Sequence, residues 1–258
     1  MTTGRGNATS GNMFPIRDHN PSNRTPFVTW ALIAANILVF LSYYQLFADP
    51  RALNLFYFTW GLVPSRLSEA PVTVLTSMFL HGGIMHLAGN MLFLWVFGDN
   101  LEDEMGHGPF LMFYLAGGAA AAFAQVAADS ASLIPMVGAS GAVAAVMGGY
   151  ILLFPRARVD ILVWIIIFIR IVPLPAWLML GLWFALQLFS GVTSDIAGGG
   201  VAYWAHAGGF LAGLTLTVPL WFRLGGPRFW ARTHGHPPHP EARYRTVRTH
   251  IPKAGTRR

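Results

Sequence analysis

Long apolar stretches separated by short polar ones make up most of the chain. Six of them have the length and composition that a helix needs to cross a bilayer, about 20 mainly apolar residues. They cover residues 27–47, 81–98, 108–127, 136–154, 175–192 and 201–222. The pattern predicts an all-α membrane protein, a bundle of six transmembrane helices. Residues 99–107, between the second and third stretches, are expected to form a short acidic loop.

Two other segments are apolar or aromatic without having the pattern of a span. Residues 48–71 contain several aromatic residues, which suit a segment lying at the membrane surface. Residues 161–169 are strongly apolar but too short to span, and Arg170, Pro173 and Pro175 follow closely. We expect this second segment to be a packed loop or to lie on the membrane surface.

Composition supports the membrane class. Hydrophobic residues make up 54% of the chain and charged residues only 11%, whereas about 25% of the residues of a soluble domain are charged. The chain contains no cysteine, which excludes disulfides, thiolate chemistry and cysteine-ligated metals.

The net charge of +6 is carried almost wholly by arginine. Six spans place both termini on one side, together with every Lys and Arg except Arg51 and Arg66. Basic loops mark the cytoplasmic side, so the charge indicates two cytoplasmic termini rather than nucleic-acid binding. We expect a flexible tail over residues 1–26, a six-span domain over 27–222 and a basic, disordered tail over 223–258.

Polar residues inside the predicted spans gather at one depth. His86, Ser140 and His206 each lie about five residues into spans two, four and six, so all three are about 7 Å deep. Ionisable groups are costly inside a bilayer and indicate function by default. No predicted span contains a carboxylate.

A serine beside a histidine indicates an activated nucleophile. His206 would take the proton of Ser140 while the serine Oγ attacks a carbonyl, and without a carboxylate the pair would be a dyad. His86 and Asn90 share a helix face at i and i+4. Their side chains and the free backbone N–H of Ser140 at its helix N-terminus are expected to bind an oxyanion.

Small residues suit a close approach of the fourth and sixth spans. Gly138 and Gly141 flank Ser140, and Gly209 and Gly213 form a G-x-x-x-G step after His206. Such steps let membrane helices pack closely, either within one chain or between two copies. We favour packing within the chain, which would bring the histidine within hydrogen-bond reach of the serine.

The chain resembles the rhomboid intramembrane serine proteases. The three signature motifs are Gly138-Ala139-Ser140-Gly141, His81-Gly82-Gly83-Ile84-Met85-His86-Leu87-Ala88-Gly89-Asn90 and Ala205-His206-Ala207-Gly208-Gly209. Residues 153–158 and 174–177 are similar to many bacterial members, and the resemblance covers about residues 27–222.

The resemblance implies a six-helix core that hydrolyses a peptide bond in or near a substrate's transmembrane helix. It implies that Ser140 is the nucleophile and His206 the base. It also implies an oxyanion site of His86, Asn90 and the Ser140 N–H, with His81 mainly structural. No cofactor and no metal are implied. The implied partners are transmembrane proteins and membrane lipids, and the implied location is a bacterial plasma membrane; the oligomeric state is left open.

Two positions depart from the family pattern. Val72-Thr73 stands where members often have Trp-Arg in the first outer loop. Ala144 stands where some members have an aromatic residue that stacks on the catalytic histidine. We expect another aromatic residue, Tyr203 or Trp204, to hold His206.

Three other interpretations remain beside the protease. Ser140 is an ordinary packing residue if the histidine does not reach it. Relatives of this fold that lack the catalytic pair bind membrane clients without cutting them, and a transporter or proton channel would need a polar path through both leaflets.

Two groups of polar residues have simpler explanations. The tail histidines lack a scaffold, so weak metal binding or none is expected of His234, His236 and His239. Polar residues scattered through the helical segments are expected to link helices to one another. They are Asn36, Gln45, Gln125 and Gln187.

Overall fold

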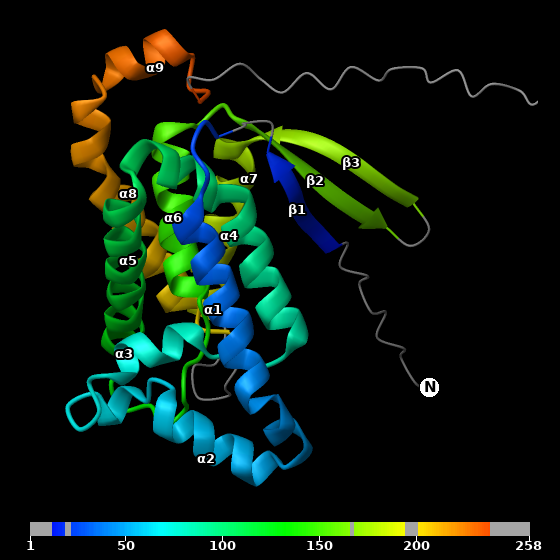
Figure 1. Cartoon of the computed structure of the whole chain (residues 1–258), viewed down its shortest axis with the longest axis vertical. Coiled ribbons are helices and arrows are strands. Elements are labelled where there is room, and N and C mark those ends of the chain that lie inside the picture. The colour runs from blue at the N-terminus through cyan, green and yellow to red at the C-terminus, as the bar shows by residue number, and fades with distance from the viewer. Residues whose placement is uncertain (1–11, 19–21, 166–167, 194–200, 238–258) are drawn as a thin grey trace, which may run out of the picture.

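The computed structural model describes residues 12–18, 22–165, 168–193 and 201–237. Six long helices form a bundle in which α6 occupies the centre (Figure 1). They are α1 (Phe27–Tyr43), α4 (Ile84–Met105), α5 (His107–Ala128), α6 (Ser140–Leu153), α7 (Ala176–Thr193) and α8 (Tyr203–Arg223). These helices match the six predicted spans in order and position, and the protein is a mainly helical membrane protein.

The helices differ in how readily each could cross a membrane alone. Four apolar helices pass on length and composition: Phe27–Ala48, His107–Ala128, Ala176–Thr193 and Tyr203–Arg223. α4 passes together with the bent segment Thr73–Phe79, which precedes it at an angle of 95°. α6 has only 14 residues, a length of about 21 Å. Because neighbouring helices rather than lipid surround it, α6 does not need the full thickness of the bilayer.

Backbone contact between α6 and α8 fixes the middle of the bundle. A Cβ on Gly148 of α6 would collide with the carbonyl of Phe210, and one on Gly213 of α8 would collide with the backbone of Ala145. Helices in lipid associate through such close van der Waals packing, because the hydrophobic effect does not drive them together. The predicted role of the G-x-x-x-G step in packing within the chain agrees with this contact.

Short helices connect α1 to α4 at the end of the bundle where α6 begins. They are η1 (Tyr44–Ala48), α2 (Pro50–Trp60), η2 (Pro64–Arg66), α3 (Thr73–Thr76) and η3 (Ser77–Phe79). α2 lies across this end of the bundle (Figure 1). It starts cleanly because the Asp49 side chain accepts from the N–H groups of Arg51 and Ala52, with Pro50 at the first position.

A three-stranded antiparallel sheet lies at the opposite end, in the order β1-β2-β3, and corrects two predictions. The strands are β1 (Asn12–Asp18), β2 (Arg158–Ile165) and β3 (Phe168–Pro175). The sequence predicted a flexible tail over residues 1–26, yet β1 pairs with β2 and Asp18 Oδ2 accepts from Asn100 and Tyr150. The apolar segment predicted as a packed loop or a membrane-surface segment forms a hairpin, because β-branched residues favour strands.

The acidic loop predicted over residues 99–107 is also wrong. α4 continues to Met105, and only Gly106, in a left-handed conformation at φ 83°, separates it from α5. Glu102 is buried because its carboxylate accepts from the N–H groups of Val28 and Thr29 at 2.8 Å each. α1 has no cap of its own, so a side chain of α4 fixes where it begins.

Part of the tail predicted as disordered over residues 223–258 is helical. α9 (Pro227–Thr233) packs against the C-terminal end of α6, with Phe229 buried and the Trp230 indole donating to the Leu152 carbonyl at 2.9 Å. Arg156 N also donates to the Gly235 carbonyl. The rest of that prediction, residues 238–258, lies outside the described residues.

Replacing Gly213 by alanine is expected to lower the free energy of unfolding by about 1–3 kcal/mol, because the new methyl group meets the backbone of Ala145. Thermal unfolding in detergent measures this change. Gly181→Ala in α7 is the matched control, since among the described residues no atom outside the nearby backbone of its own helix lies within 4 Å of its added Cβ. Equal unfolding midpoints for the two variants would contradict the packing described above.

Candidate active site

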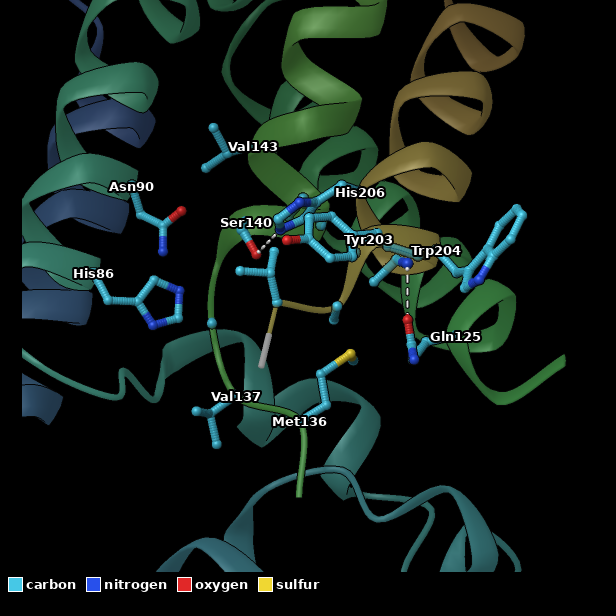
Figure 2. Close-up of a pocket in the computed structure, with 18 of the residues that line it drawn as sticks. His86, Asn90, Gln125, Met136, Val137, Ser140, Val143, Tyr203, Trp204 and His206 are labelled. Carbon is cyan, nitrogen blue, oxygen red and sulfur yellow. Dashed lines mark hydrogen bonds between the residues drawn. The ribbon is translucent and has the colours of Figure 1, made fainter. Parts of the chain in front are cut away.

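A cavity of about 900 Å³ opens at the end of the bundle where α6 begins. Side chains from α4, α5, α6, α7 and α8 line it, together with the segment that leads into α6. Figure 2 shows its principal side chains converging from different helices. All five polar residues that the sequence singled out in spans two, four and six lie at this end, and four of them line the cavity: His86, Asn90, Ser140 and His206.

The chain is held firmly just before Ser140. Met136 exchanges backbone hydrogen bonds of 2.7 and 3.0 Å with Leu62, and Gly138 N donates to the Ser77 carbonyl at 2.9 Å. Gly138 has φ 139°, and a Cβ there would stand 2.9 Å from the imidazole of His86. Only glycine combines this conformation with that close approach. These hydrogen bonds fix the segment so that Ser140 is the first residue of α6, where its backbone N–H has no partner within the helix.

Ser140 and His206 meet across the contact of α6 and α8. The serine Oγ lies 2.7 Å from His206 Nε2, a hydrogen bond that Figure 2 marks. The two helices can come this close because Gly209 has no side chain; a Cβ there would collide with the carbonyl of Gly141. The histidine thus reaches Ser140, and the serine hydroxyl is placed where it can lose a proton to the ring.

The second nitrogen of His206 is held from α7. Nδ1 lies 2.8 Å from Gln187 Oε1, and the Trp183 ring lies 5.8 Å from the imidazole between centroids. The expected aromatic support exists, but it does not come from Tyr203 or Trp204, and Figure 2 shows the Trp204 ring turned away. Trp183 and Gln187 are four residues apart on one face of α7, a spacing that in retrospect marks the pair.

His86 and Asn90 project from α4 on the other side of Ser140 (Figure 2). His86 Nδ1 accepts from Gly82 N at 3.3 Å, which leaves the ring proton on Nε2. Asn90 is buried, and its Nδ2 has no hydrogen-bond partner among the described residues. A buried donor without a partner is costly unless a ligand accepts from it. The two side chains and the Ser140 N–H are thus able to stabilise negative charge on a bound oxygen.

His81 lies behind His86 and does not line the cavity. Its backbone is fixed by two tyrosines: its carbonyl accepts from Tyr43 and Tyr57, and its N–H donates to the Tyr43 oxygen at 2.7 Å. Its ring packs edge-on against His86 at 5.2 Å. Tyr57 belongs to α2, outside the spans, and burial raises the pKa of its hydroxyl. The hydroxyl therefore keeps its proton and donates a hydrogen bond at neutral pH.

The remaining polar predictions divide in two. Gln125 links helices as expected, because its Oε1 accepts from Ala205 N at the start of α8. The Asn36 amide donates to Leu32 O within its own helix, and its side chain also lies beside the Tyr114 hydroxyl of α5. Within the part of the chain that the structure describes, no three His, Cys, Asp or Glu side chains gather as a metal site. His239, one of the tail histidines, lies outside that part.

Comparison with known proteins agrees with the arrangement of these motifs. Residues 68–223 match the family model of the Rhomboid domain. The chain belongs to the rhomboid family. It is 29% identical over 191 residues to Rhomboid protein 1, mitochondrial, of Saccharomyces cerevisiae, covering 72% of this chain and 51% of that protein.

Two further relatives show the breadth of the rhomboid family. The chain is 30% identical over 133 residues to the human presenilin-associated rhomboid-like protein, mitochondrial, covering 51% of this chain and 34% of that protein. It is 43% identical over 75 residues to Rhomboid protease GluP of Bacillus subtilis, covering 29% and 14%. The chain thus spans about half or less of the length of these relatives. They include mitochondrial and bacterial proteins, so the bacterial plasma membrane stays a prediction.

If Asn90 holds an oxyanion, replacing it by alanine is expected to slow reaction at Ser140 about 100-fold, because a donor to the bound oxygen is lost. The unfolding midpoint should change little, since Nδ2 has no partner among the described residues. Rate of labelling by a fluorophosphonate and thermal unfolding measure the two effects. Asn36 is a buried amide away from the cavity. Its replacement by alanine should leave the labelling rate unchanged and lower the free energy of unfolding by about 1 kcal/mol. An Asn90 variant that reacts at the wild-type rate would contradict the assignment.

Proposed function

We propose that this rhomboid protein is an intramembrane serine endopeptidase that acts through a Ser140–His206 dyad. The observation that carries the proposal is the 2.7 Å contact between Ser140 Oγ and His206 Nε2 inside a cavity that also holds the His86 and Asn90 donors. A packing serine needs neither the histidine nor the unpartnered amide. Membership of a family that includes a named protease supports the same reaction.

Acylation follows from the positions of these groups. His206 Nε2 takes the hydroxyl proton as Ser140 Oγ bonds to the carbonyl carbon of the substrate. The carbonyl oxygen becomes an oxyanion, which accepts from the Ser140 N–H, His86 Nε2 and Asn90 Nδ2. The C–N bond then breaks, the amine leaves with the proton held by His206, and an acyl-serine remains.

Deacylation reverses the roles with water. His206 removes a proton from a water molecule that attacks the acyl carbon, the same donors hold the second oxyanion, and the proton returns to Ser140 as the carboxylic product leaves. The cavity opens at the end of the bundle, so water has access there without crossing the hydrocarbon core.

The substrates we propose are transmembrane proteins. A carbonyl hydrogen-bonded within a helix is shielded from attack, so the cut segment should contain helix-breaking residues. With both termini in the cytoplasm, as the basic residues indicate, α6 begins near the outer face and cleavage occurs there. Membrane lipids surround the bundle, and neither a cofactor nor nucleic acid takes part.

A fluorophosphonate is expected to label the detergent-solubilised protein at Ser140, because its phosphorus is attacked by an activated serine. Gel fluorescence compares the wild type with Ser140→Ala and His206→Ala, and both variants should lose labelling. A folded wild type that is not labelled would reject the dyad and favour a membrane-binding module. Labelling without cleavage of any helix-breaking transmembrane substrate in proteoliposomes would reject the endopeptidase.

A further inference from the structure

Two side chains of α7 complete the surroundings of the His206 ring. Gln187 Oε1 lies 2.8 Å from Nδ1, and the Trp183 ring lies 5.8 Å from the imidazole between centroids, tilted by 34°. They are one helical turn apart, so both contacts are made or lost together when α7 moves. Among the described residues, 194–200 not being among them, none that lines the cavity is an Asp or Glu. The position that a carboxylate holds in a catalytic triad is here taken by an amide.

The direction of this hydrogen bond determines which ring nitrogen can act as base. When Gln187 Oε1 accepts, Nδ1 carries the proton and the lone pair of Nε2 faces Ser140. When the amide is turned, its nitrogen donates to Nδ1, the proton moves to Nε2, and the ring cannot take the serine proton. The oxygen-inward arrangement at 2.8 Å is the productive one.

α7 is the least buried of the apolar helices that could span alone. Only 17% of its 18-residue apolar stretch is buried, against 33% for that of α8 and 39% for that of α5. Leu182, Leu186, Phe189 and Val192 are exposed along it. On its inner side it is held by stacking of Phe184 on Phe210 at 4.7 Å, and by Gly191 against Tyr203 and Trp204. Side chains hold α7 to α8, whereas backbone contact holds α6 to α8.

We propose that Gln187 is a positioning residue for His206, and that docking of α7 on α8 therefore sets the reactivity of Ser140. This inference rests on the proposed function and adds a means of regulating it. A movement of α7 away from α8 removes the acceptor from Nδ1 and the Trp183 ring from its place beside the imidazole, and the dyad loses its alignment. A transmembrane substrate that enters productively leaves the Gln187 contact in place.

Variants of Gln187 test the positioning role through the kinetics of fluorophosphonate labelling. Gln187→Leu removes the acceptor and should lower the maximal labelling rate about tenfold or more, with the half-saturating probe concentration unchanged. Gln187→Glu keeps an acceptor oxygen at the same reach and should restore the rate. As the pH is lowered, this variant should lose labelling at a higher pH than the wild type does, since a carboxylate favours the protonated ring. Gln45→Leu, the same change in η1 away from the cavity, should label as the wild type does.

The outcomes separate this inference from the proposed function. A wild type without labelling rejects the dyad itself. A labelled wild type with an equally fast Gln187→Leu variant rejects only the positioning role. A folded Gln187→Glu variant that is as slow as Gln187→Leu also overturns it, because an acceptor oxygen would then not be what His206 requires.

A disulfide tests whether α7 must be docked. A Cβ built on Gly191 lies 3.4 Å from Tyr203 Cβ, close to the separation of about 3.5–4.5 Å found in disulfides. The chain has no other cysteine, so oxidation of Gly191→Cys/Tyr203→Cys joins only α7 and α8. The oxidised form should label at least as fast as the reduced form of the same variant. Slower labelling after oxidation would overturn the proposal, because the docked helix would then not be the aligned state.

Discussion

The structure depends on one contact, the approach of the α6 backbone to the α8 backbone. Glycines on both helices make it possible: Gly148 on α6, and Gly209 and Gly213 on α8. A helix of 14 residues is too short to be a stable span in lipid by itself, so α6 exists because α4, α5, α7 and α8 surround it. The same contact sets the distance between Ser140 and His206, which couples packing directly to chemistry.

Local patterns were enough to predict the helices and the pair at the centre. Hydrophobic length gives the spans, and a common depth of His86, Ser140 and His206 along parallel spans is a geometric consequence of helix rise. Asn90 follows from its place one turn after His86. These features needed no knowledge of which helices are neighbours beyond the small residues that permit close approach.

The features that were missed all depend on contacts between distant segments. A short apolar run such as residues 161–169 has no periodicity that separates a buried strand from a loop, and its partner β1 lies in a stretch that looks like a tail. α9 is stabilised by burial of Phe229 against the C-terminal end of α6. Gln187 was expected to link helices and does join α7 to α8, but its contact with His206 could not be predicted before α7 is placed beside α8. Sequence therefore predicted that Ser140, His206, His86 and Asn90 lie together, but not that Gln187 contacts the second ring nitrogen of His206.

The most direct test of the account is a structure of the protein after reaction with a fluorophosphonate. We expect phosphorus bonded to Ser140 Oγ and the phosphonyl oxygen within hydrogen-bond distance of the Ser140 N–H, His86 Nε2 and Asn90 Nδ2. His206 should remain between Ser140 and Gln187. An adduct on another residue, or a phosphonyl oxygen pointing away from His86 and Asn90, would contradict the site described here.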